Sequence, residues 1–429
     1  MTAGMIEGGR LRRVLLGTSA AVVLTAGLAG VAPTAVAVDA QSQQWYLDAM
    51  RAEDIWKTAT GSGIKVAVID TGVNPNTPSL KGKVLKGMDN AEVKGDETDD
   101  YTGHGTTMAE IIVGSGAGGG IKGLAPDAKV IPYRVSDTEL QNEQKVNPYD
   151  MEEAIKAAAD GDAQIINVSF ASEYYSSYIR DAVKYARAKG KLLFAGVGNS
   201  AAKGNKPQYP AAFPEAIAVA ASDETGHAAK FSQHGDFVDL SAPGSAIPGW
   251  CNEKFKSYCV TDGTSNATAI ASASAALIWS VHPDWTGNQV LRAMLESASR
   301  DWESGTVSNA LGYGIVRPNA NINRGIGKPG DPNINPLTNE KVGGKSATSG
   351  TAGTSGASGK PGATTEPGAS TAPGSSQAPE AKPSADGVVA GSDKSADSGS
   401  PLGLVIGGVA VVAVVAVAAF LVVRRRRTA

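Results

Sequence analysis

Three residue types that cooperate in acyl transfer occupy separate places in this chain. Asp70 ends a short apolar run, His104 lies between two glycines, and Ser265 precedes an alanine-rich stretch. A serine hydroxyl is a weak nucleophile until an imidazole accepts its proton, and that imidazole needs a carboxylate to hold its tautomer. We therefore expect Asp70, His104 and Ser265 to form one catalytic set.

Each of these residues also has an ordinary structural explanation. An aspartate at a strand end often caps a turn, a histidine at a helix start can be structural, and a serine before an apolar run is a common helix N-cap. Taken singly, these explanations stay open. For Ser265, however, the small and apolar residues 266–279 predict a buried helix whose N-terminus would stabilise developing negative charge.

Short apolar runs alternate with amphipathic segments through the middle of the chain. Residues 65–69, 165–170, 192–197 and 216–221 are rich in Val, Ile and Ala, which is typical of buried parallel strands. The alternation predicts an α/β fold, a mostly parallel sheet with helices on both faces. Ligands of such folds bind beyond the carboxyl ends of the strands, where Asp70 would lie.

Both ends of the chain carry long apolar segments. Residues 1–37 combine arginines, an apolar run and an Ala-x-Ala site, which indicates a secretory signal peptide, with an uncleaved anchor as the alternative. Residues 401–423 are uncharged and long enough for one transmembrane helix, and the basic tail 424–429 should stay in the cytoplasm. We expect a single-pass protein of the cell membrane whose catalytic domain is extracytoplasmic.

The segment before the C-terminal apolar stretch has a different composition. Residues 326–400 are rich in Pro, Gly, Ser and Thr and cannot bury enough apolar surface to fold. We expect a disordered linker with a mean reach on the order of 45–50 Å, and a glycosylated adhesive stalk is the alternative. What remains is a catalytic domain at 61–325 and an N-terminal extension at 38–60.

Cysteines and charge limit the chemistry and the partners. Cys251 and Cys259 flank a short polar segment, which in an exported protein predicts a disulfide, with free thiols as the alternative. The net charge of −3 gives no reason to expect nucleic acid. The acidic run 96–100 could hold a cation, but a solvated loop is the favoured explanation. We expect no metal site and no cofactor.

The surroundings of the three residues together resemble the signatures of the subtilisin family of serine proteases, the subtilases. VIDTG at 68–72, GHGT at 103–106 and GTSNAT at 263–268 follow the family's order of Asp, His and Ser. The Gly-Asn pair at 198–199 resembles the family's oxyanion-hole position, and further similarities extend the match over residues 55–325.

The resemblance implies a role for each matching residue. Ser265 would be the nucleophile, His104 the base and then the acid, and Asp70 the residue that orients His104. Asn199 and the backbone N–H of Ser265 would form the oxyanion hole.

The resemblance also implies a groove for an extended peptide, lined by Ser169, Phe170, Ala171 and Arg134. Ala171 stands where the family commonly has glycine, and its methyl group should narrow this groove. Glu110 is a further departure from the pattern, because a small glycine is frequent there and a buried carboxylate needs a partner.

The order of segments is similar to that of the mycosins, which are membrane-anchored subtilases associated with type VII secretion in actinobacteria. The similarity implies protein or peptide substrates and, as partners, type VII secretion components of the membrane.

The leading prediction is a membrane-anchored serine endopeptidase. The alternative is a subtilase-shaped scaffold of a secretion complex with little or no proteolysis. A scaffold need not keep Asp70, His104, Asn199 and Ser265 at once, so the sequence favours the enzyme.

Overall fold

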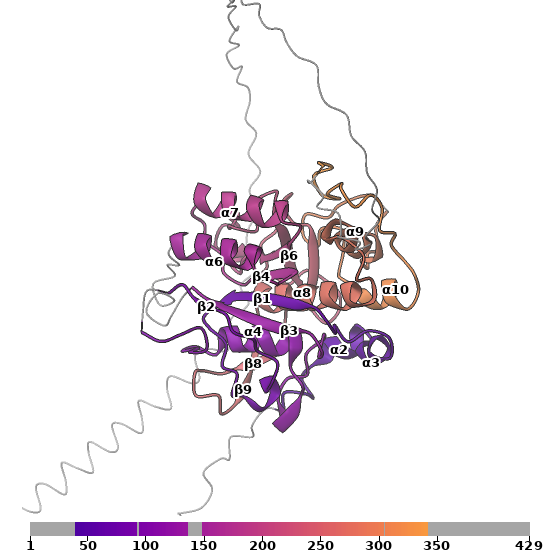
Figure 1. Ribbon diagram of the computed structural model, residues 1–429. Coiled ribbons are helices and arrows are strands. Elements are labelled where there is room, and N and C mark those ends of the chain that lie inside the picture. The colour runs from indigo at the N-terminus through magenta and orange to yellow at the C-terminus, as the bar shows by residue number, and fades with distance from the viewer. Residues whose placement is uncertain (1–38, 92–93, 136–147, 304, 342–429) are drawn as a thin grey trace, which may run out of the picture. The chain divides into compact units, whose positions relative to one another are not determined.

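The computed structural model describes residues 39–91, 94–135, 148–303 and 305–341 (Figure 1). The predicted signal peptide, transmembrane helix and basic tail lie outside the described residues, as do residues 342–400 of the predicted linker. Within the described ranges, no helix combines the length and the apolar composition that crossing a membrane requires.

Seven parallel strands form the central sheet, in the order β2-β3-β1-β4-β5-β6-β7. They are β1 (Lys65–Asp70), β2 (Met88–Asp89), β3 (Lys129–Arg134), β4 (Ile165–Val168), β5 (Leu192–Gly196), β6 (Ile217–Ser222) and β7 (Leu240–Pro243). The four predicted strands correspond to β1, β4, β5 and β6, so the predicted parallel sheet is confirmed. β4 ends two residues earlier than predicted, which leaves Ser169 and Phe170 beyond the strand.

Helices surround this sheet. The α-helices are α2 (Trp45–Ala49), α3 (Ala52–Trp56), α4 (His104–Val113), α6 (Pro148–Asp160), α7 (Ser177–Ala188), α8 (Thr264–Val281), α9 (Gly287–Ser297) and α10 (Pro318–Ile322). Three short 3-10 turns are η1 (Pro78–Leu80), η2 (Ala117–Gly119) and η3 (Ala201–Lys203).

Side-chain alternation along the strands creates two cores, one on each face of the sheet. On β1, Val66 and Val68 belong to one core, and Ala67 and Ile69 belong to the other. The first core includes α4 and α8, whereas α6 and α7 contribute to the second and lie across the sheet from them in Figure 1. Burial on both faces explains why the strands read as continuous apolar runs, and it confirms the predicted helix layers.

The direction of strand addition reverses between β1 and β4. After β1 the chain builds β2 and β3 on one side, and from β4 onward it builds the other side. In parallel sheets a crevice opens at such a reversal, outside the carboxyl ends of the strands. Asp70 is the last residue of β1 and Ser169 directly follows β4, so both lie at this crevice.

Helix α8 holds Ser265 on a rigid, buried support. All fourteen of its residues from Asn266 to Trp279 are buried, because most of their side chains are small and the larger ones are apolar, so the helix lies against β4 to β7. The helix begins at Thr264, after Gly263, and no side chain caps it. The simple reading of Ser265 as a helix cap is therefore wrong.

A separate antiparallel hairpin, β8 (Ile247–Trp250) and β9 (Tyr258–Thr261), precedes α8. The disulfide Cys251–Cys259 joins its two strands at the turn, as predicted. The rings of Trp250 and Tyr258 stack with centroids 4.0 Å apart, which makes the hairpin compact.

The segments on either side of the predicted catalytic domain both pack against it. In the N-terminal extension, Tyr46 and Ile55 are fully buried in the first core. At the other end, Asn335 is buried and Arg187 pairs with Glu340 at 2.8 Å. Residues 326–341 therefore pack against the domain although they are rich in Gly and Pro. This corrects the predicted start of the linker at residue 326.

Candidate active site

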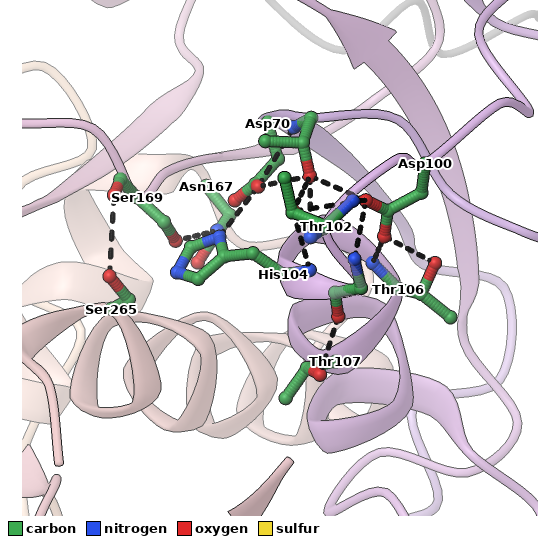
Figure 2. Close-up of polar contacts among 12 residues, drawn as sticks. Asp70, Asp100, Thr102, His104, Thr106, Thr107, Asn167, Ser169 and Ser265 are labelled. Atoms are coloured by element: carbon green, nitrogen blue, oxygen red, sulfur yellow. Dashed lines mark hydrogen bonds and ion pairs between the residues drawn. The ribbon is translucent and has the colours of Figure 1, made fainter. Parts of the chain in front are cut away.

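A carboxylate and an imidazole are paired at the end of β1. His104, the first residue of α4, places its Nδ1 2.7 Å from Oδ1 of Asp70. Asp70 is fully buried, whereas the His104 side chain is 34% exposed. The pair keeps one imidazole nitrogen on the carboxylate, and the other, Nε2, lies on the side of the ring toward Ser265 (Figure 2).

Glycines allow α4 to approach β1 this closely. A Cβ atom on Gly105 would lie 2.2 Å from the Gly72 carbonyl oxygen and 3.0 Å from the Asp70 Cβ. Gly103 has φ of 83°, a left-handed conformation that other residues rarely adopt. The glycines on both sides of His104 are therefore required by the backbone geometry and by the close approach of α4 to β1.

Asp100 anchors the beginning of α4. Its Oδ1 accepts hydrogen bonds from Thr71 Oγ1 at 2.8 Å and from the Gly103 N–H at 2.8 Å. Its Oδ2 accepts from the Thr106 N–H at 2.8 Å and from the Thr106 hydroxyl at 2.6 Å (Figure 2). The acidic run 96–100 is expected from the sequence to be a solvated loop, but Asp100 is buried and caps α4.

Electrostatics favour the protonated form of His104. Burial alone would lower the pKa of its imidazole, but the charge of Asp70, the hydrogen bond to it and the charge of Asp100 together raise that pKa above 6.5. The imidazole is thus a base whose protonated form is stabilised within the site.

Ser265 lies beside this pair at the first turn of α8. Its hydroxyl donates to the backbone oxygen of Ser169 at 3.3 Å, as Figure 2 shows. Ser265 and His104 line the same pocket, which has a volume of about 310 Å³. The structure therefore brings Asp70, His104 and Ser265 to one place from three distant parts of the chain.

Asn199 lines the same pocket from the end of β5. Its side-chain oxygen accepts hydrogen bonds from the N–H of Thr264 at 2.8 Å and from the Thr264 hydroxyl at 3.0 Å. With the oxygen held in this way, the amide NH₂ group is free to donate toward a ligand beside Ser265. Asn199 is a predicted site residue and Thr264 is not, because the role of Thr264 depends on a contact across 65 positions of sequence.

A further buried polar contact braces α8 against β4. Asn167 is fully buried, and its oxygen accepts from the Ser272 hydroxyl at 3.1 Å while its NH₂ donates to Ser169 Oγ at 2.9 Å. An asparagine within the apolar run 165–168 was the sequence signal for this residue, because a buried amide needs partners.

The predicted groove residues divide into two groups. Ser169 and Phe170 are half-exposed and Ala171 is exposed, all just beyond β4, and the Phe170 ring lies 6.5 Å from the His104 ring. The prediction for Arg134 is wrong. Its side chain is fully buried and pairs with Asp89 of β2. The reason is that β3 lies between β2 and β1, on the side of β1 away from β4 and the crevice.

The acidic run has local uses for its carboxylates. Asp96 accepts from the Thr98 N–H at 2.8 Å, and Asp99 accepts from the Asp96 N–H at 3.0 Å. In the part of the chain that the structure describes, no group of three or more His, Cys, Asp or Glu residues is arranged to hold a metal ion.

Glu110 has the partners that a buried carboxylate requires. It lies on α4 and accepts hydrogen bonds from Thr77 Oγ1 and from the Tyr258 hydroxyl, each at 2.8 Å. Burial raises the pKa of its carboxyl group to about 7, although both hydrogen bonds act to lower that pKa. The contact with Tyr258 ties the histidine helix to the disulfide-linked hairpin.

Comparisons with known proteins show the family to which this chain is similar. The model of the subtilase family (Peptidase S8) matches residues 61–314. Thermitase of Thermoactinomyces vulgaris is 36% identical over 239 residues, which cover 55% of this chain and 82% of thermitase.

Solved structures are similar over the same region. The MycP3 protease from the type VII (ESX-3) secretion system has a TM-score of 0.58 at 27% identity, covering 67% of this chain and 90% of that one. The serine protease MycP1, described as an essential component of the type VII (ESX-1) secretion system, has a TM-score of 0.57 at 28% identity, covering 68% and 90%.

Proposed function

The chain belongs to the subtilase family and is a subtilisin-like serine endopeptidase, and from this premise we propose that Asp70, His104 and Ser265 are its catalytic triad. The observation that carries the proposal is the 2.7 Å contact between Asp70 and His104 with Ser265 in the same pocket. The hydroxyl of Ser265 leaves the Ser169 carbonyl and turns to His104 when substrate binds.

In the proposed reaction His104 moves one proton twice. Its Nε2 accepts the Ser265 hydroxyl proton while Oγ forms a bond to the peptide carbonyl carbon. The same proton then passes to the leaving amine as the C–N bond breaks, and water releases the acyl group by the reverse sequence. Asp70 stabilises the imidazolium and holds the ring in place.

The oxyanion of the intermediate is bound by two donors in this scheme. The NH₂ of Asn199 is one, since Thr264 occupies the oxygen of that amide, and the backbone N–H of Ser265 is the other. The N-terminal end of α8 adds a favourable dipole. Ser169, Phe170 and Ala171 form the edge along which the substrate lies extended, where the Ala171 methyl group narrows the groove.

We further propose that this protease acts at the cell membrane in type VII secretion. The names of the similar MycP1 and MycP3 structures and the order of signal peptide, protease domain, linker and C-terminal apolar segment support this role. The linker would begin after residue 341 and would keep the catalytic domain near the membrane on its outer side. Exported proteins are the expected substrates.

Two serines of α8 provide a matched test. Ser265→Ala should abolish cleavage of an unfolded protein such as casein by the purified ectodomain. Ser280→Ala should leave cleavage unchanged, because that hydroxyl donates only to the Leu277 carbonyl of its own helix. Equal cleavage by wild type and Ser265→Ala contradicts the triad, and a folded wild type that cleaves nothing favours the scaffold role.

A further inference from the structure

The pocket beside Ser265 is built from elements other than the Ser169–Ala171 edge. Its walls come mainly from α4, from the β8–β9 hairpin and from the start of α8. We call it the leaving-side pocket and define it by His104, Thr107, Met108, Trp250, Asp262 and Asn266. The lining includes none of Ser169, Phe170 and Ala171, so substrate on that edge leaves the pocket free.

The position of His104 in the wall of this pocket decides which part of a substrate enters it. This step rests on the proposed function, in which His104 gives its proton to the leaving amine. That amine belongs to the residue immediately after the cleaved bond. The side chain of this residue therefore extends into the leaving-side pocket.

Trp250 supplies a fixed apolar wall. Its ring stacks on Tyr258 at 4.0 Å and meets Phe255 edge-on at 5.4 Å, and the backbone N–H of Trp250 donates to Thr107 Oγ1 at 2.9 Å. Tyr258 in turn donates a hydrogen bond to Glu110 of α4. Contacts within the hairpin and between the hairpin and α4 therefore fix the position of the Trp250 ring. Such a surface favours the aliphatic stem of a long side chain.

Asp262 supplies the charge of this pocket. It is exposed, and one of its oxygens accepts from the Ala246 N–H at 2.8 Å. It is the sole carboxylate in the lining, which has no lysine or arginine. Lys254 and Lys256 lie in the hairpin turn and do not line the pocket.

We propose that the leaving-side pocket selects lysine or arginine immediately after the cleaved bond, with the stem on Trp250 and the charged end at Asp262. Leucine or methionine would use the apolar wall alone. Glutamate and aspartate would be disfavoured by the carboxylate of Asp262.

Peptide substrates that differ only in the residue after the cleaved bond test this proposal. A bond that wild type cleaves is first located in casein by mass spectrometry, and that residue is then changed to Arg, Leu or Glu. We expect kcat/KM to fall in this order, with Arg over Glu by at least about tenfold. Asp262→Asn should reduce kcat/KM for the Arg peptide to the value for the Leu peptide. The control Asp284→Asn, which changes an exposed aspartate outside the pocket, should leave kcat/KM for all three peptides unchanged.

A second measurement avoids dependence on the rest of the substrate. An acyl-enzyme formed from an ester can be released by an added amino acid amide instead of water, and the amide must occupy the leaving side. Argininamide should compete with water better than leucinamide, and Asp262→Asn should remove that advantage. Trp250→Ala should make both amides compete less well with water for the acyl-enzyme.

The outcomes separate the specificity proposal from the proposed function. Normal labelling of Ser265 by a fluorophosphonate together with equal use of Arg, Leu and Glu would overturn the specificity alone. A preference for Arg that persists in Asp262→Asn would overturn it as well. Absence of both labelling and cleavage would instead overturn the proposed function.

Discussion

At the residue scale, the account depends on the charge relation between Asp70 and His104. Asp70 has no exposed surface, and the 2.7 Å contact places its charge next to the imidazole. The pKa of His104 is raised above 6.5 because this charge and hydrogen bond outweigh the effect of burial. A base with a raised pKa stays protonated, and so inactive, to a higher pH.

This relation can be measured by titrating the His104 ring with NMR in a Ser265→Ala background. We expect a midpoint above 6.5. Asp70→Asn removes the charge and leaves burial dominant, so the midpoint should fall. A midpoint that does not move on this substitution would show that Asp70 does not control His104.

Single residues also show what sequence can and cannot reveal. Asp70, His104 and Ser265 were predictable because glycines and apolar runs mark their surroundings. Asp100 and Thr264 were missed because their roles are hydrogen bonds to elements that only the fold brings near. Arg134 was misplaced for the same reason, since its ion pair with Asp89 joins β3 to a neighbouring strand.

At the element scale, the contact between α4 and the β8–β9 hairpin is the least expected feature. Thr107 and Glu110 of α4 meet Trp250 and Tyr258 of the hairpin through polar contacts. The sequence predicts that Glu110 needs a partner, but it does not show that this partner, Tyr258, lies 148 positions away. The strands, by contrast, were predictable because burial on both faces leaves a continuous apolar run.

Glu110 should make the stability of the protein depend on pH. Its pKa is about 7 in the folded chain against 4.5 ordinarily, so the folded state holds a proton that the unfolded state has lost between these values. The contribution of Glu110 to stability is therefore present below pH 4.5 and is lost as pH rises to about 7. Glu110→Gln has no such titration, so its free energy of unfolding should rise relative to that of wild type by up to about 3 kcal/mol between pH 5 and 8.

Denaturant unfolding of both proteins across this pH range measures the difference. The exposed Glu224→Gln serves as a control for loss of a carboxylate. If the free energies of unfolding of wild type and Glu110→Gln differ by a constant amount from pH 5 to 8, the raised pKa of Glu110 is refuted.

At the scale of the whole molecule, the folded catalytic part includes residues on both sides of the predicted domain at 61–325. The N-terminal extension contributes Tyr46 and Ile55 to the core, and residues 326–341 add Asn335 and the Arg187–Glu340 ion pair. Composition could not predict that residues 326–341 pack against the domain, because only a few of them make these contacts and the rest are rich in Gly and Pro. The structured catalytic part therefore extends beyond residues 61–325 at both ends.

Truncation tests this extent. An ectodomain that ends at residue 325 should be less stable by about 1–3 kcal/mol than one that ends at residue 341, because it loses the buried Asn335 and the packing of the half-buried Leu337 against the first core. Thermal unfolding of the two proteins checks the prediction. Equal melting temperatures would mean that residues 326–341 add nothing to the fold.

In the proposed function, three residues from distant parts of the chain act as one nucleophilic site. Its most direct test is reaction of the ectodomain with a fluorophosphonate, followed by mass spectrometry of the labelled peptide. We expect one adduct on Ser265 that is lost in Ser265→Ala and that forms much more slowly in His104→Ala. Labelling at another serine, or none in a folded wild type, would contradict it.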